Sequence, residues 1–442
     1  MTSRYTSIRA DNTPSTGVIS FKNGFPLLSF TLSAQNGLLD PSTIRINGKF
    51  AAYKDNLAVP TALQSGDQVT MNNRLGIFNV IESLTIRAAR SKLSCESIRG
   101  YSKLMNSYLS MTSSLQDQMG NLNELCLCQP NSETFRKSVM ESPTATAQTN
   151  SFSTHLPCGF LSSGNMVDLR QDAFGGIIIE ILLMPDSNVL YSQAGSSTGI
   201  GDAHYELSDL SLTCEISDIP DDDKPSDSGV YEFNTITSLY SSINSTNAQI
   251  QYTLALQNVL SAFMTFVPVK NINTLTEDGQ VCVQLSGDGS SDDALAPITR
   301  VQWLKGGTKY PADFDYVTNI VDPDNTATMV VDPQLINNFI DSILPDYTHE
   351  RFSISPVNCN RDYNMTNSAT VETSYGLIPE GGSVYGLGVK YGIGGAGEDF
   401  RTEQFGVSIE SNLKSDRPQG MYIFIKARAQ LMFDAGSIQL KQ

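Results

Sequence analysis

The sequence contains few charged side chains, and fewer basic than acidic ones. Charged residues make up 17% of its 442 residues, below the roughly 25% of typical soluble domains. Lys and Arg number 29 against 46 Asp and Glu, which leaves a formal net charge of −17 at pH 7. Broad contact with nucleic acid requires clustered Lys and Arg, and the sequence has no run of basic residues. The composition therefore argues against a nucleic-acid-binding protein.

Long hydrophobic runs are missing as well. The longest apolar stretches, residues 175–185 and 260–269, fall well short of the ~20 residues that a membrane-spanning helix needs. The start of the chain lacks the apolar core of a secretory signal peptide. The seven cysteines are odd in number and scattered, which is typical of free thiols rather than of a disulfide framework. We therefore expect a soluble protein that is made in a reducing compartment and is not secreted.

Residues that commonly bind metals are few and far apart. Three histidines are present at distant positions: His155, His204 and His349. Cys126 and Cys128 lack the second pair of ligands that a zinc site needs. Residues 322–328 resemble the start of a calcium-binding loop, but Ala327 stands where glycine is needed and no glutamate occupies the twelfth position. The sequence therefore predicts no metal site.

Patterns for catalysis and cofactor binding are also missing. The glycine-rich segment 392–397 precedes a predicted strand, not the helix whose N-terminus would hold a phosphate, so we interpret it as a turn between strands. No predicted strand leads through a Gly-x-Ser-x-Gly turn into a helix, as a nucleophile elbow requires, although the fold alone can gather a Ser-His-acid triad. We predict no catalytic or cofactor-binding residues, no cofactor and no enzymatic activity.

Apolar residues alternate with polar ones along much of the chain. In segment 43–52, Ile44, Ile46 and Phe50 fall on one face, as a half-buried strand requires. The clearest case is residues 422–433, where apolar residues occupy every second position. The dominant period of two indicates a protein built mainly of strands.

Helical patterns are short and rare. Residues 332–344 have Pro333 at the first helical position and apolar residues on one side. Residues 97–111 form a second candidate helix, and residues 250–266 can be interpreted either as strands or as a buried helix. Many strands and few helices favour an antiparallel sandwich over a βαβ arrangement.

The best domain boundary is an acidic linker at residues 218–229, whose prolines and glycine do not suit a central strand. The strands predicted before it are 27–33, 42–53, 67–73, 77–90, 152–161, 176–184 and 205–217. The strands predicted after it are 232–242, 248–257, 260–269, 298–304, 384–391, 405–411, 421–433 and 436–440. We therefore predict an all-β fold of two tandem eight-stranded antiparallel jelly-roll sandwiches with a few short helices in the connecting loops. The predicted parts are an N-terminal arm (1–26), a first jelly roll (27–219) and a second jelly roll (220–442).

Several stretches, taken in order, resemble a known family. Residues 29–50 read as strand, turn and strand, and residues 298–314 contain the single tryptophan. Between them, similar pieces follow one another at 74–86, 100–105, 152–161 and 205–219. This order resembles the double-jelly-roll major capsid proteins of the virophage and polinton-like group of small eukaryotic DNA viruses. Gly100 stands before Tyr101 where that family has Asn, so the hydrogen-bonding role of the Asn is not carried over.

The resemblance implies a structural protein of a virion. In that family three chains form a homotrimer, a pseudo-hexagonal tile, and such capsomers cover an icosahedral capsid together with penton and minor capsid proteins. The chain would then assemble inside the host cell. Long insertions at 112–150 and 305–380 would form outer towers or clasps between subunits.

The N-terminal arm holds the only local excess of basic residues. Arg4, Arg9 and Lys22 stand there against one acid, Asp11. We interpret the arm as a packing tail, with weak contacts to the genome or the capsid interior as the alternative.

Two other functional classes stay open. A β-sandwich adhesin or carbohydrate-binding protein could use Trp303 and Tyr310 to stack a sugar, although a core or interface role fits them better. A β-sandwich glycoside hydrolase would need two carboxylates about 5 to 10 Å apart in a cleft.

Overall fold

The computed structural model describes most of the chain. The described residues are 3–22, 24, 26–56, 59–63, 67, 69–72, 75–109, 127, 147, 149–192, 202–220, 228–280, 298–311, 316–317, 320–321, 329–330, 333–343, 386–392, 396–411, 418–434 and 436–442.

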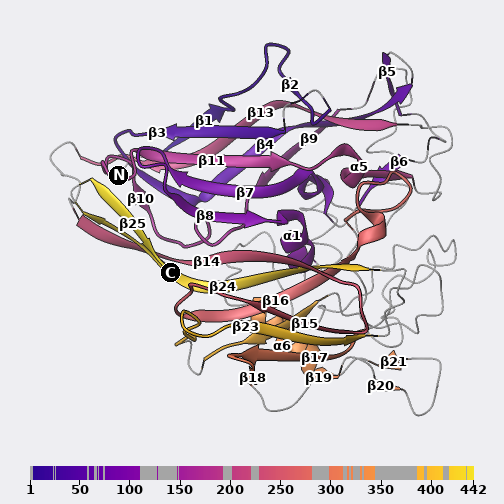
Figure 1. Cartoon of the computed structure of the whole chain (residues 1–442). Coiled ribbons are helices and arrows are strands. Elements are labelled where there is room, and N and C mark those ends of the chain that lie inside the picture. Colours follow the sequence, from indigo (N-terminus) through magenta and orange to yellow (C-terminus); the bar gives the residue numbers. More distant parts are fainter. Residues whose placement is uncertain are drawn as a thin grey trace.

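The first half of the chain forms two antiparallel sheets that face each other (Figure 1). The seven-stranded sheet contains β1 (Ser3–Arg9), β2 (Val18–Ile19), β4 (Leu38–Asn56), β5 (Val59–Ala62), β9 (Asn150–His155), β10 (Val167–Asp168) and β13 (Ala203–Ser217). The four-stranded sheet contains β3 (Leu27–Ser33), β11 (Gly176–Leu183), β7 (Ile81–Ala88) and β8 (Ser94–Arg99). The smaller elements are β6 (Val69–Met71), β12 (Leu190–Ser192), η1 (Gly76–Val80), α1 (Tyr101–Leu109) and α5 (Asp186–Val189).

The second half forms another pair of sheets. One contains β14 (Ser228–Ile243), β24 (Gln419–Asp434), β16 (Val259–Pro268), β22 (Leu387–Lys390) and β25 (Ser437–Lys441). The other contains β15 (Asn247–Tyr252), β23 (Phe405–Ser411), β17 (Ile298–Lys305), β18 (Thr308–Lys309) and β19 (Tyr316–Val317). The smaller elements are β20 (Ile320–Val321), β21 (Met329–Val330), η3 (Val269–Asn271) and α6 (Pro333–Ile343).

The strand order is the same in both halves. In the first half, β1 pairs with β13, β13 with β4 and β4 with β9, while the facing sheet runs β3-β11-β7-β8. In the second half the corresponding orders are β14-β24-β16-β22 and β15-β23-β17-β18. In each half the first long strand therefore lies beside the last, which is the arrangement of a jelly roll. The predicted fold of two tandem jelly rolls is confirmed.

Strand β1 differs from the expectation for the N-terminal arm. Residues Ser3–Arg9 pair with Ser211–Ser217 of β13 along their whole length, so they are an edge strand of the first sheet and not a free tail. Val18–Ile19 extend the same edge of β13. Within the segment 1–26, Ser3–Arg9 and Val18–Ile19 thus supply two strands of the first sandwich. The linker that motivated the boundary at 219/220 has residues 221–227 outside the described part, so this boundary stays a prediction.

The helical predictions were partly right. α6 falls within residues 332–344, where it was predicted, whereas α1 begins only at Tyr101 because residues 94–99 pair with β7 as strand β8. The alternative of a buried helix at 250–266 is wrong, since these residues belong to β15, a short turn and β16. Gly386 and Gly388 let α6 lie close to β22, because a Cβ on either would come within 2.5 Å of side-chain atoms of Phe339 or Ser342.

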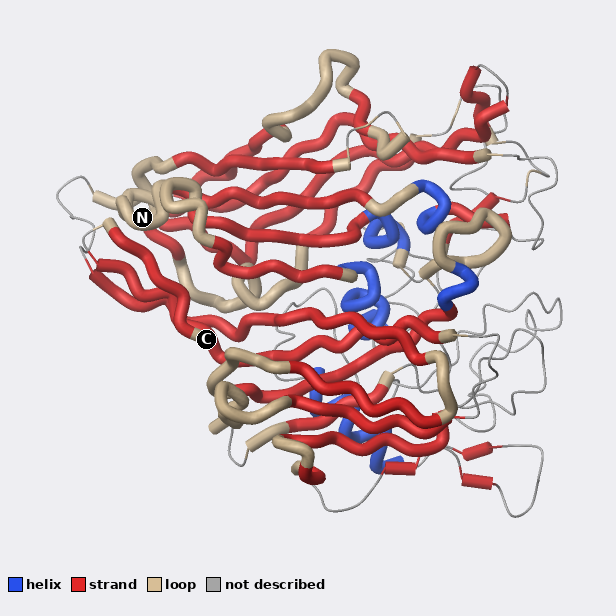
Figure 2. The backbone as a smooth tube through the Cα atoms, in the orientation of Figure 1, coloured by secondary structure: helices blue, strands red, loops and turns tan. Residues whose placement is uncertain are grey.

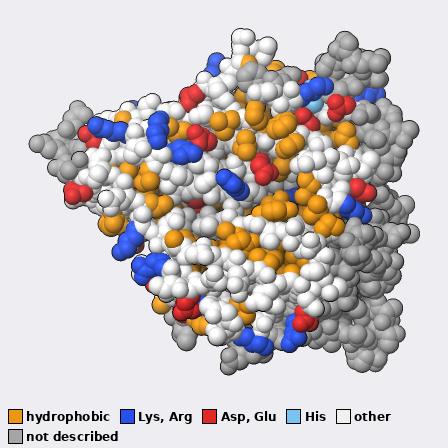
Figure 3. Space-filling view, in the orientation of Figure 1, with side chains coloured by type: hydrophobic (Ala, Val, Ile, Leu, Met, Phe, Trp, Pro, Cys, Tyr) orange, Lys and Arg blue, Asp and Glu red, His pale blue; other side chains and the backbone are white. Residues whose placement is uncertain are grey.

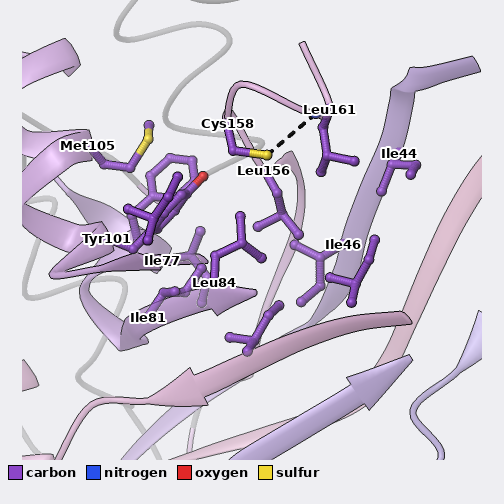
Figure 4. Packing of buried hydrophobic residues seen from close by; sticks show 14 of the residues in the cluster. Ile44, Ile46, Ile77, Ile81, Leu84, Tyr101, Met105, Leu156, Cys158 and Leu161 are labelled. Atoms are coloured by element: carbon purple, nitrogen blue, oxygen red, sulfur yellow. Dashed lines mark hydrogen bonds between the residues drawn. The ribbon is translucent and has the colours of Figure 1, made fainter. Parts of the chain in front are cut away.

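The two sheets of each sandwich face each other (Figure 2), and buried apolar side chains fill the space between them. Figure 4 shows part of the first core, where Tyr101 and Met105 of α1 pack toward Ile77 and Leu84. This cluster does not stop at the first sandwich. It continues into Tyr231, Phe233 and Phe424 of the second half, whereas the interior of the second sandwich forms a separate cluster. The junction is thus an extension of the first core.

Candidate functional site: the junction of the two sandwiches

Helix α1 lies between the two sandwiches (Figure 1), and all nine of its residues are buried. A surface helix normally leaves its polar face in water. Here the polar side chains face a segment of the second half instead. Ser102 and Lys103 donate to Oε1 of Gln280 at 2.9 and 2.6 Å, and Asn106 donates to its backbone oxygen at 3.0 Å. Lys103 also donates to the carbonyl of Gly279 at 2.8 Å.

The other side of Gln280 is held by the first half as well. Its Nε2 donates to the carbonyl of Asn188 in α5 at 3.1 Å. Nearby, Nδ2 of Asn72 donates to Asp278 at 2.8 Å. These hydrogen bonds tie the segment around residues 278–280 to α1 and α5, so this segment of the second sandwich is anchored in the first.

Buried Lys426 provides a second link. Its Nζ donates to the carbonyl of Ile343 at 2.7 Å and lies over the rings of Tyr108 and Phe263, 5.9 and 5.6 Å from their centroids. Tyr108 belongs to α1, whereas Phe263 and Lys426 belong to the second half. A buried ammonium group requires such partners, because burying an unpaired charge costs roughly several kcal/mol of folding free energy.

Glu96 is the third link and the only buried carboxylate among the described residues. Oε2 accepts the amide N–H of Phe160 at 2.8 Å, and Oε1 accepts those of Gly159 at 3.2 Å and Ile236 at 2.8 Å. Ile236 lies in β14, so the carboxyl group of a first-sandwich strand binds the backbone of the second sandwich. Burial raises the pKa of Glu96 to about 7, although hydrogen bonds from these amides and from Cys158 oppose the rise.

The main chains also approach closely here. A Cβ added to Gly159 would lie 1.6 Å from the carbonyl oxygen of Asn234 in β14. No side chain fits at this position unless the strand moves. The contact therefore fixes the distance between the loop after β9 and β14.

Aromatic rings complete the junction. Phe160 of the first half packs against Tyr231 and Phe233 of β14, with ring centroids 5.0 and 5.4 Å apart. Phe174 lies 6.0 Å from Phe433 of β24. Such tilted and edge-to-face pairs add about 0.5–1.5 kcal/mol each beyond the burial of their area.

Two grooves flank the junction. One, of about 510 Å³, has a mainly polar lining that includes Ser163, Glu232, Arg428 and Lys441. The other, of about 360 Å³, is lined by Glu82, Lys103, Leu182 and Tyr422 among others. Burial raises the pKa of Glu82, and the charges of Lys103 and Arg99 oppose the rise. Figure 3 shows apolar side chains on this face of the molecule, some of them near the boundary of the sandwiches.

The basic residues of the predicted arm do not form one binding patch. Arg4 lies 3.4 Å from Asp218 and donates to the side chain of Gln35 and the carbonyl of Asn36. Arg9 is at the opposite end of β1, and Lys22 lies beyond β2. The structure therefore uses Arg4 to hold the edge strand near the end of β13.

The residues considered for a sugar site are not exposed together. Trp303 is 2% exposed and packs on Phe405, with ring centroids 5.9 Å apart. Tyr310 stacks on Tyr391, and its hydroxyl donates to Glu398. Trp303 therefore belongs to the core of the second sandwich, as the alternative interpretation held.

The other candidate motifs gain little support. Within the described part of the chain, no group of three or more His, Cys, Asp or Glu side chains is placed to hold a metal ion. His155 accepts a hydrogen bond from Arg45 at 3.1 Å, and Nε2 of His204 lies 3.3 Å from Glu206. His349, Cys126, Cys128 and the segment 322–328 lie outside the described residues. Cys95, Cys158 and Cys214 are free and buried.

Two further findings concern the glycine-rich turn and membranes. Gly392 and Gly397, the two ends of the glycine-rich segment, lie close together. A Cβ added to Gly392 would lie 2.7 Å from the backbone nitrogen of Gly397. Residues 393–395 between them lie outside the described part. Among the described helices, none has the length and apolar character needed to cross a bilayer.

Solved structures of viral capsid proteins share this architecture, although no protein-family model and no curated protein matches the sequence. The cryo-EM structure of the Sputnik virophage contains a chain that aligns with all of this chain and 88% of its own length, with 10% identity and a TM-score of 0.56. The Faustovirus major capsid protein aligns with 98% of this chain and 90% of its own, with 10% identity and a TM-score of 0.54. The mavirus major capsid protein aligns with 99% and 90%, with 9% identity and a TM-score of 0.52.

The chain has the double-jelly-roll fold of these viral proteins. The alignments span both sandwiches, so the likeness includes the tandem arrangement and not a single jelly roll. At such low identity they establish the fold alone, and the function needs a separate argument.

Sequence reasoning did not point to the junction residues. Glu96 sits in a strand that was not predicted, and Gln280 lies in a polar stretch that resembles a loop. Neither has a local signal, because each is defined by partners more than 60 residues away in the chain.

Proposed function

We propose that this chain is the major capsid protein of a DNA virus, a structural and not a catalytic protein. The observation that carries the proposal is the tandem pair of jelly rolls with the same strand order, joined by a hydrophobic cluster that extends from the first sandwich into the second half. The similarity to virophage and Faustovirus capsid proteins along nearly the whole chain supports it.

In this proposal the chain forms a homotrimer. Two rigidly joined sandwiches per chain give six per trimer, which approximates a hexagon and can tile an icosahedral shell. A ring of three closes on itself and consumes its contact surfaces, so it does not grow into a fibre. Neighbouring capsomers, penton proteins and minor capsid proteins would be its partners, and the virion, assembled inside the host cell, its location.

The mass of the purified protein in solution tests the trimer. A chain of 48.1 kDa gives a trimer of about 144 kDa, three times the chain mass, in light scattering coupled to size exclusion. Negative-stain images of that peak should show pseudo-hexagonal plates, and concentrated samples should show closed particles. A species that stays at 48 kDa at all concentrations, without particles, would rule out the proposal.

A further inference from the structure

We propose that Glu96 is a protonation-dependent latch between the two sandwiches: the neutral carboxyl group closes the junction and the ionised one loosens it. The latch is a property of a single chain, so it does not depend on assembly into a capsid.

The geometry places Glu96 where three chain segments meet. Its oxygens bind the amides of Gly159 and Phe160 in the loop after β9 and of Ile236 in β14. The close approach of Gly159 to Asn234 leaves no room for a side chain at position 159. The carboxyl group is thus the only polar side chain that connects all three segments at this point among the described residues.

In the part of the chain that the structure describes, no positive charge is among the causes of the altered pKa of Glu96. Cys158 faces Glu96 from the loop, Cys95 precedes it on β8, and β14 contributes the amide of Ile236 with Tyr231 nearby. The causes of its altered pKa, burial first and then these hydrogen bonds, include no charged side chain among the described residues. A carboxylate buried without a cation is costly, so ionisation favours states in which water reaches the group.

The neutral form keeps its partners. With the proton on Oε2, Oε1 still accepts the amides of Gly159 and Ile236. Protonation therefore removes the charge without breaking the link to β14.

The sign of the pH dependence follows from the pKa of Glu96, which rises from its usual 4.5 to about 7 on folding. Between these values the folded chain holds a proton that the unfolded chain has released. The free energy of unfolding therefore falls as the pH rises from 4.5 to 7, and the unfolding constant grows by at most about 300-fold. Below 4.5 and above 7, Glu96 contributes no further change.

Amide hydrogen exchange measures the latch directly. We expect the protection of the Phe160 and Ile236 amides, corrected for the intrinsic exchange rate, to fall between pH 5 and pH 8 in the wild type. In Glu96→Gln, which cannot ionise, the protection of these amides should be the same at both pH values. The exposed Glu403→Gln should behave as the wild type does and serves as the matched control.

Cys158→Ala tests the role of Glu96 even if the Glu96→Gln variant does not fold. The hydrogen bond from Cys158 lowers the pKa of Glu96, so its removal should move the loss of protection to a higher pH. Wild-type protection that is constant or increases with pH overturns the proposal, and so does a transition that persists in Glu96→Gln.

Discussion

At the scale of single residues, the junction depends on polar groups that have been removed from water. Gln280 accepts from Ser102 and Lys103 and donates to Asn188, so its amide satisfies groups on two elements of the first sandwich. We expect Gln280→Ala to lower the free energy of unfolding by about 2–4 kcal/mol, because the buried Lys103 loses one partner and Ser102 loses its own. Urea denaturation followed by intrinsic fluorescence measures the change.

Gln439→Ala is the matched control for this substitution. Gln439 is exposed on β25, so its loss should change the free energy of unfolding by no more than about 0.5 kcal/mol. If the two variants were equally stable, the hydrogen bonds of Gln280 would not hold the sandwiches together.

These residues also show where inference from the sequence ends. The alternation of Ile44, Ile46 and Phe50 predicts a buried face, because burial of a strand leaves a local periodic signal. The roles of Glu96 and Gln280 leave no such signal, since their hydrogen bonds depend on how two distant chain segments are placed. The burial of Trp303 was easier to predict from the sequence, because a large aromatic residue in a strand usually lies on the buried face.

At the scale of elements, nearly all the long strands were predictable, whereas the edge strands β1 and β8 were not. β14 and β24 pair along 16 residues each, and their alternating apolar residues were visible in the sequence. β1 was not predicted as a strand; it is exposed along most of its length, as an edge strand with little core contact permits, so it has little apolar periodicity. β8 was assigned in part to a helix, and its ladder with β7 overrides that local preference.

The edge position of β1 leads to a prediction about truncation. Removal of residues 1–9 would leave β13 without its partner over seven residue pairs. We expect the melting temperature to fall by about 5 °C or more, because several ladder hydrogen bonds are lost and Ile8 no longer covers the core. Differential scanning calorimetry of the truncated chain measures this.

Tyr5→Ala is the control for this truncation, because it removes an exposed side chain of β1 and keeps the backbone of the strand. Tyr5 is 79% exposed, so this variant keeps the ladder and should melt within about 1 °C of the wild type. A truncated chain with an unchanged melting temperature would mean that the pairing of residues 3–9 with β13 does not stabilise the first sandwich.

At the scale of the whole molecule, the chain has few charged side chains but a large negative net charge. The net charge of −17 and the isoelectric point near 4.6 mean that copies repel one another at neutral pH. If trimers tile a shell, this repulsion opposes contacts between tiles. Exposed charges are screened over about 8 Å at 0.15 M salt and about 3 Å at 1 M.

We therefore expect salt and mild acid to promote assembly of the purified trimer. Light scattering at fixed protein concentration should increase from 0.05 M to 1 M NaCl at pH 8, and at low salt it should increase as the pH falls toward 6. Electron microscopy distinguishes closed particles from amorphous aggregate at each condition. Scattering that decreases with salt would contradict this prediction. It would mean that attractive ion pairs hold neighbouring tiles together, rather than polar and apolar contacts that act against the repulsion of the net charge.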